Sequence, residues 1–217
     1  MIKKVLLVVA VLVLGVIVLI ATRPSSYLVE RTTTIEAPVE VVFEQVDDLH
    51  KWEQWSPWEK LDPAMTKTYE GPARGVGAIY AWAGDEKVGE GRMTIAESVP
   101  GERIAIQLQF IKPWESTNTT TFLFSSPAEG SSSVSWQTTG EMNFGAKAAA
   151  LFMDMDGMLG ADLESGLAEL KKVSEAESKR RIEEERVREA AALAAAAAAA
   201  DAGEADPEAL EDAPPAE

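Results

Sequence analysis

The sequence has 217 residues, a length that fits one ordinary domain with appendages. Its formal net charge of −16 repels phosphate backbones and therefore argues against nucleic-acid binding. The absence of cysteine excludes disulfides, thiolate catalysis and zinc sites built from cysteine, but it does not identify a cellular compartment.

The N-terminal segment is apolar enough to cross a membrane. From Val5 to Ala21 no residue is charged, and a helix of that length spans about 26 Å, near the lower limit for a bilayer. We therefore predict that residues 1–24 form a retained membrane anchor. A cleaved signal peptide and a buried helix are the alternatives, and the exit Leu-Ile-Ala-Thr-Arg-Pro is a poor cleavage site.

The charges that flank the apolar segment predict its orientation. Lys3, Lys4 and the amino terminus outweigh Arg23, so the N-terminus should stay in the cytoplasm. We expect a single-pass membrane protein whose following domain lies on the extracytoplasmic side, which is the periplasm in a bacterium.

The segment after the anchor is typical of strands joined by short turns. A first strand is followed by a short helix, which begins at Pro38 and ends near Asp47. The later turns contain Gly84, Pro100 or Gly130 and are too short for parallel crossovers, so the sheet should be an antiparallel meander. The strands are expected at residues 27–36, 65–70, 77–83, 87–99, 103–112, 118–126 and 132–139.

Past Gly140 the apolar residues recur every three or four positions, which predicts one long amphipathic helix. Its apolar face is formed by Leu151, Met155, Leu159, Leu163, Leu167 and Leu170. A curved sheet of six or seven strands can bury this face by wrapping around the helix, with a cavity left between them. The predicted fold class is α+β, and residues 25–174 form the predicted ligand-binding domain.

The C-terminal part has a different composition. Residues 175–200 are first charged and then rich in alanine, and pairs such as Glu177 and Arg181 stand at i,i+4 spacing. We expect a helical extension there, either solvated or bound to a protein partner. Residues 201–217 are acidic and rich in alanine and proline, so we expect a disordered tail.

Large aromatic residues are concentrated in the strands and in one turn-rich segment. Trp52, Trp55 and Trp58 fall within seven residues and require a partner surface, which is either a core or a cavity that holds an apolar ligand. The expected ligand-binding residues are Trp55, Trp58, Tyr80, Trp82, Trp114, Phe122, Trp136 and Met155.

Four segments carry a family resemblance: YLVERTTTIEAPVEVVFEQVDD, WEQWSPWEKLDP, and GVGAIYAW followed by VGEGRMTIAESVPGERIAIQLQF. They resemble the SRPBCC (START/Bet v 1-like) superfamily, and in particular its polyketide cyclase/dehydrase-like branch. The resemblance covers roughly Tyr27 to Val173. It implies a helix-grip fold with a deep apolar cavity that binds lipids, sterols, polyketides or other hydrophobic molecules. A minority of members are enzymes, and the superfamily has no invariant catalytic set to carry over.

Four side chains are weak candidates for proton transfer: Glu90, Arg92, His50 and Tyr80. Glu90 and Arg92 share one face of their strand, but Met93 and Ile95 suit the core, which would point the two charged residues outward. One histidine without a nearby carboxylate pattern does not make a metal site. We therefore expect neither a metal nor a cofactor.

Three functions compete at this level. The favoured hypothesis is a non-catalytic, membrane-tethered module that binds a hydrophobic small molecule. The second is a cyclase or dehydratase that acts on an apolar carbonyl substrate. The third is an envelope protein whose C-terminal extension binds a protein partner.

Overall fold

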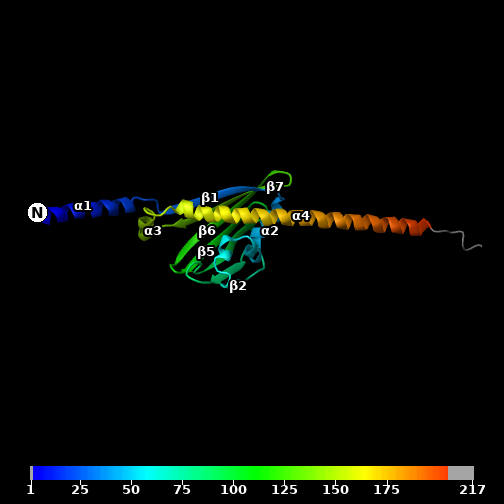
Figure 1. The fold of residues 1–217 in the computed structure, drawn as a ribbon, viewed down its shortest axis with the longest axis horizontal. Helices are drawn as coiled ribbons and strands as arrows, with labels where there is room; N and C mark the ends of the chain where they lie inside the picture. Colours follow the sequence, from blue (N-terminus) through cyan, green and yellow to red (C-terminus); the bar gives the residue numbers. More distant parts are fainter. Residues whose placement is uncertain (1, 205–217) are drawn as a thin grey trace, which may run out of the picture. The chain divides into compact units, whose positions relative to one another are not determined.

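The computed structural model describes residues 2–204, and Figure 1 shows its elements along the chain. The strands are β1 (Ser26–Ile35), β2 (Thr66–Glu70), β3 (Ile79–Ala83), β4 (Glu90–Val99), β5 (Arg103–Lys112), β6 (Ser116–Ala128) and β7 (Ser131–Glu141). The helices are α1 (Ile2–Ala21), α2 (Val39–Asp47), α3 (Phe144–Ala149) and α4 (Met155–Glu204), with short 3₁₀ helices η1 (Leu49–Gln54) and η2 (Pro57–Lys60). Most of the predicted tail, from residue 205, lies outside the described residues.

The strands form one antiparallel sheet in the order β1-β7-β6-β5-β4-β3-β2. The expected meander is confirmed, because β2 to β7 are neighbours in sequence order. Strand β1 completes the other edge by pairing with β7, with Ser26 opposite Glu141. The chain then crosses to the far edge of the sheet through α2 and through η1 and η2, which hold Trp52, Trp55 and Trp58 on or next to them and are called the tryptophan segment.

The first part of α4 packs against the inner face of this sheet. Leu163, Leu167 and Leu170 are buried there, in one cluster with the aromatic side chains of β6 and β7. Gly166 permits the close approach, because a methyl group at this position would lie 2.6 Å from a ring carbon of Trp136. The predicted α+β helix-grip architecture is therefore confirmed.

The expectation of one continuous helix from Leu151 is wrong. Residues 144–149 form the separate helix α3, and Asn143 caps it by accepting a hydrogen bond from the Ala146 amide at 2.9 Å. Helix α4 begins only at Met155, where Asp154 accepts from the Gly157 amide at 2.9 Å. Two side-chain caps thus interrupt an apolar spacing that would suit a single helix.

Helix α1 is 20 residues long with a mean hydropathy of 3.2, and it is the one helix among residues 2–204 that is long and apolar enough to cross a membrane. Its length and composition fit a membrane anchor and equally a signal sequence.

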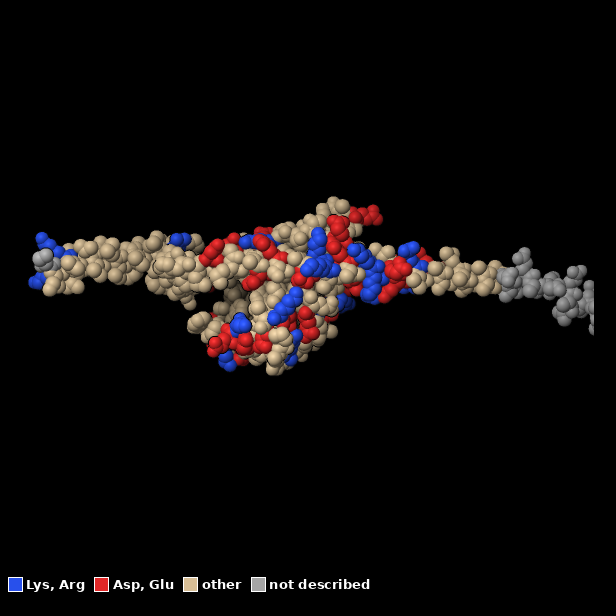
Figure 2. All heavy atoms as spheres, in the orientation of Figure 1, with Lys and Arg blue, Asp and Glu red and all other residues tan. Residues whose placement is uncertain are grey.

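The chain divides into two compact units, residues 1–175 and 176–217. In the second unit the described residues continue α4 to Glu204, first with charges of both signs and then with alanine (Figure 2). Arg181 forms the expected ion pair with Glu177 at 2.7 Å, while Glu184 pairs with Arg180 at 2.5 Å.

Candidate ligand cavity

A cavity of about 450 Å³ lies between the inner face of the sheet and the α3–α4 segment. Figure 2 shows the surface hollowed below the start of α4. Strands β3 to β7 supply one wall, the tryptophan segment a second, and residues 149–162 the third. The described residues that line it are Tyr27, Trp52, Ser56, Trp58, Glu59, Met65, Tyr80, Trp82, Lys87, Val88, Met93, Leu108, Phe110, Asn118, Thr120, Trp136, Thr138, Ala149, Ala150, Met153, Met155, Met158, Leu159 and Asp162.

The cavity exists because the side chains that point inward become smaller from one end of β6 and β7 to the other. On β6, alternate positions run from Phe124 and Phe122 to Thr120 and Asn118. The first two are buried in the core, while the last two line the cavity. On β7 the matching positions run from Val134 and Trp136 to Thr138 and Gly140, in register with β6.

Aromatic rings form most of the apolar wall. Trp82 stands between Tyr80 and Phe110, with ring centroids 6.0 and 5.8 Å apart. Across the cavity, Trp58 meets Trp136 edge to face at 5.8 Å. These rings have few rotatable bonds, so they present a rigid apolar surface to whatever enters.

One wall also carries a charged network, which is built around a buried carboxylate. Glu59 on η2 accepts a hydrogen bond from the Tyr80 hydroxyl at 2.7 Å, and its other oxygen lies 2.5 Å from the ammonium group of Lys67. Lys67 also bonds Glu53 at 2.9 Å. The carboxylate of Glu59 is only 7% exposed, so the ion pair compensates a charge that would be costly to bury alone.

These contacts shift the pKa values of the network. Burial raises the pKa of Tyr80, and the hydrogen bond to Glu59 raises it further. For Lys67, burial lowers the pKa, but the hydrogen bonds to Glu59 and Glu53 outweigh it and raise the pKa to about 12. At neutral pH Tyr80 therefore stays protonated, and Lys67 keeps its positive charge beside the Glu59 carboxylate.

A second polar group lies on β6 and β7. The indole of Trp136 donates to the Thr120 hydroxyl at 2.7 Å, and that hydroxyl lies 2.9 Å from the Thr138 hydroxyl. Tyr27 and Asp162 line the same part of the cavity, and burial raises the pKa of both side chains. The cavity thus combines an apolar lining with two small polar sites, one around Glu59 and one around Thr120.

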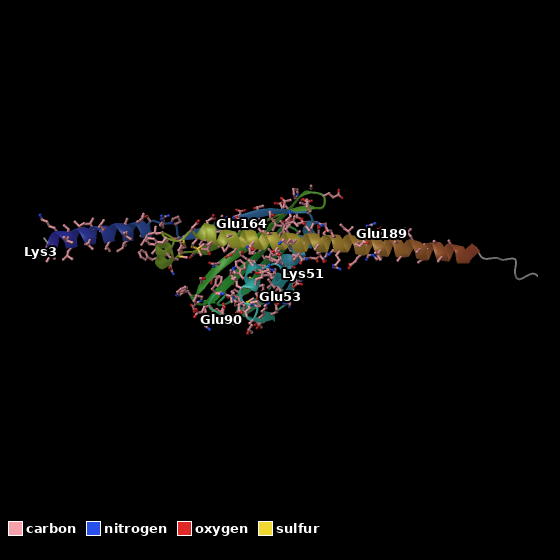
Figure 3. The ribbon with its side chains drawn as sticks, in the orientation of Figure 1. Lys3, Lys51, Glu53, Glu90, Glu164 and Glu189 are labelled. Carbon is pink, nitrogen blue, oxygen red and sulfur yellow. The ribbon has the colours of Figure 1, made fainter. Side chains whose placement is uncertain are left out.

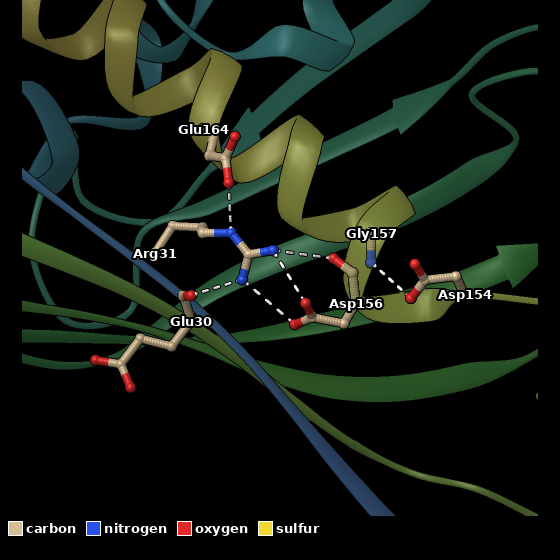
Figure 4. Close-up of polar contacts among 6 residues, drawn as sticks. All are labelled: Glu30, Arg31, Asp154, Asp156, Gly157 and Glu164. Carbon is tan, nitrogen blue, oxygen red and sulfur yellow. Dashed lines mark hydrogen bonds and ion pairs between the residues drawn. The ribbon is translucent and has the colours of Figure 1, made fainter.

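Arg31 on β1 ties the start of α4 to the edge of the sheet, and Figure 4 shows its contacts with Asp156 and Glu164. Its Nε bonds Glu164 at 2.6 Å, and one terminal nitrogen bonds the Asp156 carboxylate at 3.1 Å and the Asp156 carbonyl at 3.2 Å. Because Gly160 has no side chain, the guanidinium can lie against the helix backbone there. The ion pairs lower the pKa of Asp156 and raise that of Arg31.

Five of the eight expected ligand-binding residues line the cavity: Trp58, Tyr80, Trp82, Trp136 and Met155. The structure places the other three elsewhere. Trp55 and Phe122 are fully buried in the core, and the Trp55 indole donates to the Gln45 carbonyl at 3.0 Å. Trp114, between β5 and β6, is 81% exposed.

Of the four candidates for proton transfer, only Tyr80 lines the cavity. His50 stacks on Tyr69 with ring centroids 4.0 Å apart and lines a separate depression of about 240 Å³. Glu90, labelled in Figure 3, pairs with Lys112 at 2.6 Å. Arg92 lies on the face of β4 opposite to Met93, which lines the cavity.

Sequence reasoning missed the polar lining, above all Glu59, Thr120, Thr138 and Asp162. A signal was present for the threonines, since they stand two residues from Phe122 and Trp136 on the same faces. Nothing in the sequence marks Glu59, which lies on η2 and is buried against Lys67 of strand β2. Among residues 2–204 no group of three or more His, Asp or Glu side chains is arranged to hold a metal ion.

The sheet, the helix and the cavity between them define a helix-grip protein with an apolar cavity. A profile of the family described as polyketide cyclase / dehydrase and lipid transport matches residues 27–175, so the chain belongs to this family. A search of curated proteins gave no match.

Solved structures support the fold alone, because their identities with this chain are low. The hypothetical protein jhp0584 from Helicobacter pylori is 11% identical with a TM-score of 0.53, over 68% of this chain and 88% of its own. A Thermobifida fusca protein is 17% identical with a TM-score of 0.51, over 68% and 92%. A Nitrosospira multiformis protein is 20% identical with a TM-score of 0.50, over 70% and 99%.

Proposed function

We propose that the protein is a membrane-tethered module that binds a hydrophobic small molecule in its cavity. The observation that carries the proposal is the 450 Å³ space, which is walled by aromatic and methionine side chains and lies within the usual size range of ligand pockets. The family description, which includes lipid transport, agrees with a ligand of this class.

The two polar sites in the lining restrict the chemistry of that ligand. The Glu59 carboxylate has several acceptor sites, of which Tyr80 and Lys67 occupy some, so a ligand that donates a hydrogen bond is favoured there. Asp162 lines the cavity as a second carboxylate. An anionic headgroup would meet like charge in a poorly hydrated site, so the ligand should be neutral and carry a hydroxyl or amide.

The tether is helix α1. Its apolar length and exposure suit a bilayer, and Lys3 and Lys4 at its start favour a cytoplasmic N-terminus. A domain held on the extracytoplasmic side of the membrane would have direct access to molecules that partition into lipid.

The first experiment identifies the bound molecule. The full chain is purified in a mild detergent, and co-purifying small molecules are extracted and analysed by mass spectrometry. A stoichiometric apolar molecule is expected. An empty protein that also fails to bind the neutral dye Nile red would refute the proposal.

The second experiment tests the site itself. Trp82→Ala should weaken Nile red binding about tenfold, since it removes a central ring from the wall. Val76→Ala is the control, because Val76 is exposed and is not among the residues that line the cavity. Glu59→Gln should reduce the preference for dodecanol over dodecanoate, and an unchanged preference would remove Glu59 from ligand recognition.

The buried Tyr80–Glu59 pair favours one further candidate, a cyclase or dehydratase on an apolar carbonyl substrate. The raised pKa keeps Tyr80 protonated, so its hydroxyl could turn from Glu59 and donate its one hydrogen to a substrate carbonyl beside the carboxylate. The test incubates the protein with polyketide-like carbonyl compounds and compares Tyr80→Phe. Products that the unaltered protein forms and Tyr80→Phe does not would favour an enzyme. If neither protein converts the compounds, the binding module remains the proposed function.

A further inference from the structure

Exposed apolar side chains gather at the mouth of the cavity. Phe152, between α3 and α4, is 90% exposed, and Trp114 is 81% exposed. Together with three further exposed side chains they form a group that we call the apolar rim: Trp114, Phe144, Phe152, Met153 and Met158. Met153 and Met158 also line the cavity, so the rim is continuous with its interior. Exposed groups of this kind are rare on monomeric soluble proteins unless they bind something.

The strand register places the rim at one end of the sheet. Ser26 at the start of β1 lies opposite Glu141 at the end of β7, which leads directly into α3. At the same end, Phe110 on β5 pairs with Ser116 on β6, so the turn with Trp114 projects from there. The Trp114 turn, α3 and the α3–α4 link are therefore neighbours although they are distant in sequence.

This end of the sheet is also where the chain arrives from α1. The Met142 amide donates to the Ser25 carbonyl at 2.7 Å, and Lys147 on α3 donates to the Ser25 hydroxyl at 2.9 Å. Ser25 is thus fixed beside α3. Helix α1 ends at Ala21, and the three residues between Ala21 and Ser25 let the two Cα atoms lie at most about 14 Å apart. A bilayer crossed by α1 must therefore lie within that distance of the rim end.

We infer that the apolar rim inserts into the bilayer to which α1 tethers the domain, so that the cavity opens directly into the lipid phase. Tryptophan, phenylalanine and methionine suit the interface between headgroups and acyl chains. The inference rests on the proposed function in one respect, because it takes α1 as an anchor and the cavity as the site of an apolar ligand.

Charge is not what holds this surface to the membrane. Basic residues at the rim end are outnumbered by acidic ones, so attraction to anionic lipids is weak. The basic residues are Arg23, Lys87, Lys112 and Lys147, and the acidic ones are Asp85, Glu86, Glu90, Glu115, Glu141 and Asp154. Insertion should therefore occur in zwitterionic vesicles.

The cysteine-free chain allows a direct test. Phe152→Cys and Val76→Cys are labelled with an environment-sensitive fluorophore in the full-length protein, reconstituted in phosphatidylcholine vesicles that contain nitroxide lipids. Val76 is the matched control, since it is apolar and 59% exposed but precedes β3 at the opposite end of the sheet. Trp114→Cys is a second rim variant on a different loop, and circular dichroism verifies that each variant folds.

The lipid nitroxides should quench the label at position 152 at least threefold more than the label at position 76, and iodide in the aqueous phase should show the reverse order. Position 114 should behave like position 152. Equal lipid quenching at positions 152 and 76 would overturn the inference, as would a label at 152 that is shielded from iodide but not quenched by lipid, since that result means a protein covers the rim. Mass spectrometry of co-purified molecules decides the proposed function separately, so either idea can fail while the other stands.

Discussion

The two ends of the space between α4 and the sheet differ in what fills them. At one end Leu163, Leu167 and Leu170 meet Phe122 and Trp136, and the interior is closed. At the other end the same strands present Thr120 and Thr138 to the methionine-rich start of α4, and a cavity remains. The backbone architecture is the same at both ends. The size of the side chains along β6 and β7 therefore creates the cavity, without any change in the backbone architecture.

The largest effect on stability should come from removing a large side chain that packs against the closed end. Trp136→Ala removes a ring that is 1% exposed, contacts Phe122 and Trp58, and donates to Thr120. We expect a loss of about 3–5 kcal/mol in the free energy of unfolding, measured by urea titration. Trp114→Ala, at an exposed position, should change it by less than about 0.5 kcal/mol. Similar losses in the two variants would contradict the packing described for the closed end.

A second change fills the open end. Thr138→Leu adds apolar volume on the wall of the cavity and should weaken Nile red binding about tenfold without a large loss of stability. Thr138→Ser keeps the hydroxyl near Thr120 and should bind the dye normally. If both variants bind equally well, the ligand does not occupy the part of the cavity beside β7.

A third effect concerns the charged wall of the open end at alkaline pH. Burial raises the pKa of Tyr69 to about 12, and the carboxylates of Glu53 and Glu59 hold the pKa of Lys67 at about 12. Both pKa values lie above those of the unfolded chain, so these groups stabilise the fold fully below about pH 10 and lose that contribution as the pH rises towards 12. The urea midpoint should fall over this interval, and Tyr69→Phe should flatten the fall. A midpoint that stays constant up to pH 12 would argue against this network.

The smallest effect is expected from the second compact unit, outside the residues that match the family. Deletion of residues 176–217 removes the second compact unit, and none of its described residues, 176–204, lines the cavity. Nile red affinity and the co-purifying molecule should therefore stay unchanged, as measured by fluorescence titration and mass spectrometry. A weaker binding of the dye would assign the extension a role at the site, whereas a lost protein partner would support the interaction predicted for residues 175–200.

The sequence by itself determined the sheet and the helix that fills it. Period-two strands with short turns require antiparallel neighbours, and leucines at three- and four-residue spacing require a buried helical face, so the α+β meander followed from local rules. It also indicated an aromatic wall that includes Trp58, Tyr80 and Trp82. The helix boundary was missed because Asn143 and Asp154 cap two helices within one apolar repeat.

Only the tertiary structure decided which aromatic residues face the cavity. Trp55 and Trp58 are three residues apart in one turn-rich segment, yet one is sealed in the core and the other lines the open end. Likewise, Arg31 depends on Asp156, which lies 125 residues further along the chain, and Glu59 on η2 depends on Lys67 in another element, strand β2. Residue type and spacing determine local structure, but burial and ion pairing depend on which surfaces meet when the sheet closes around the helix, and that information is not local in the sequence.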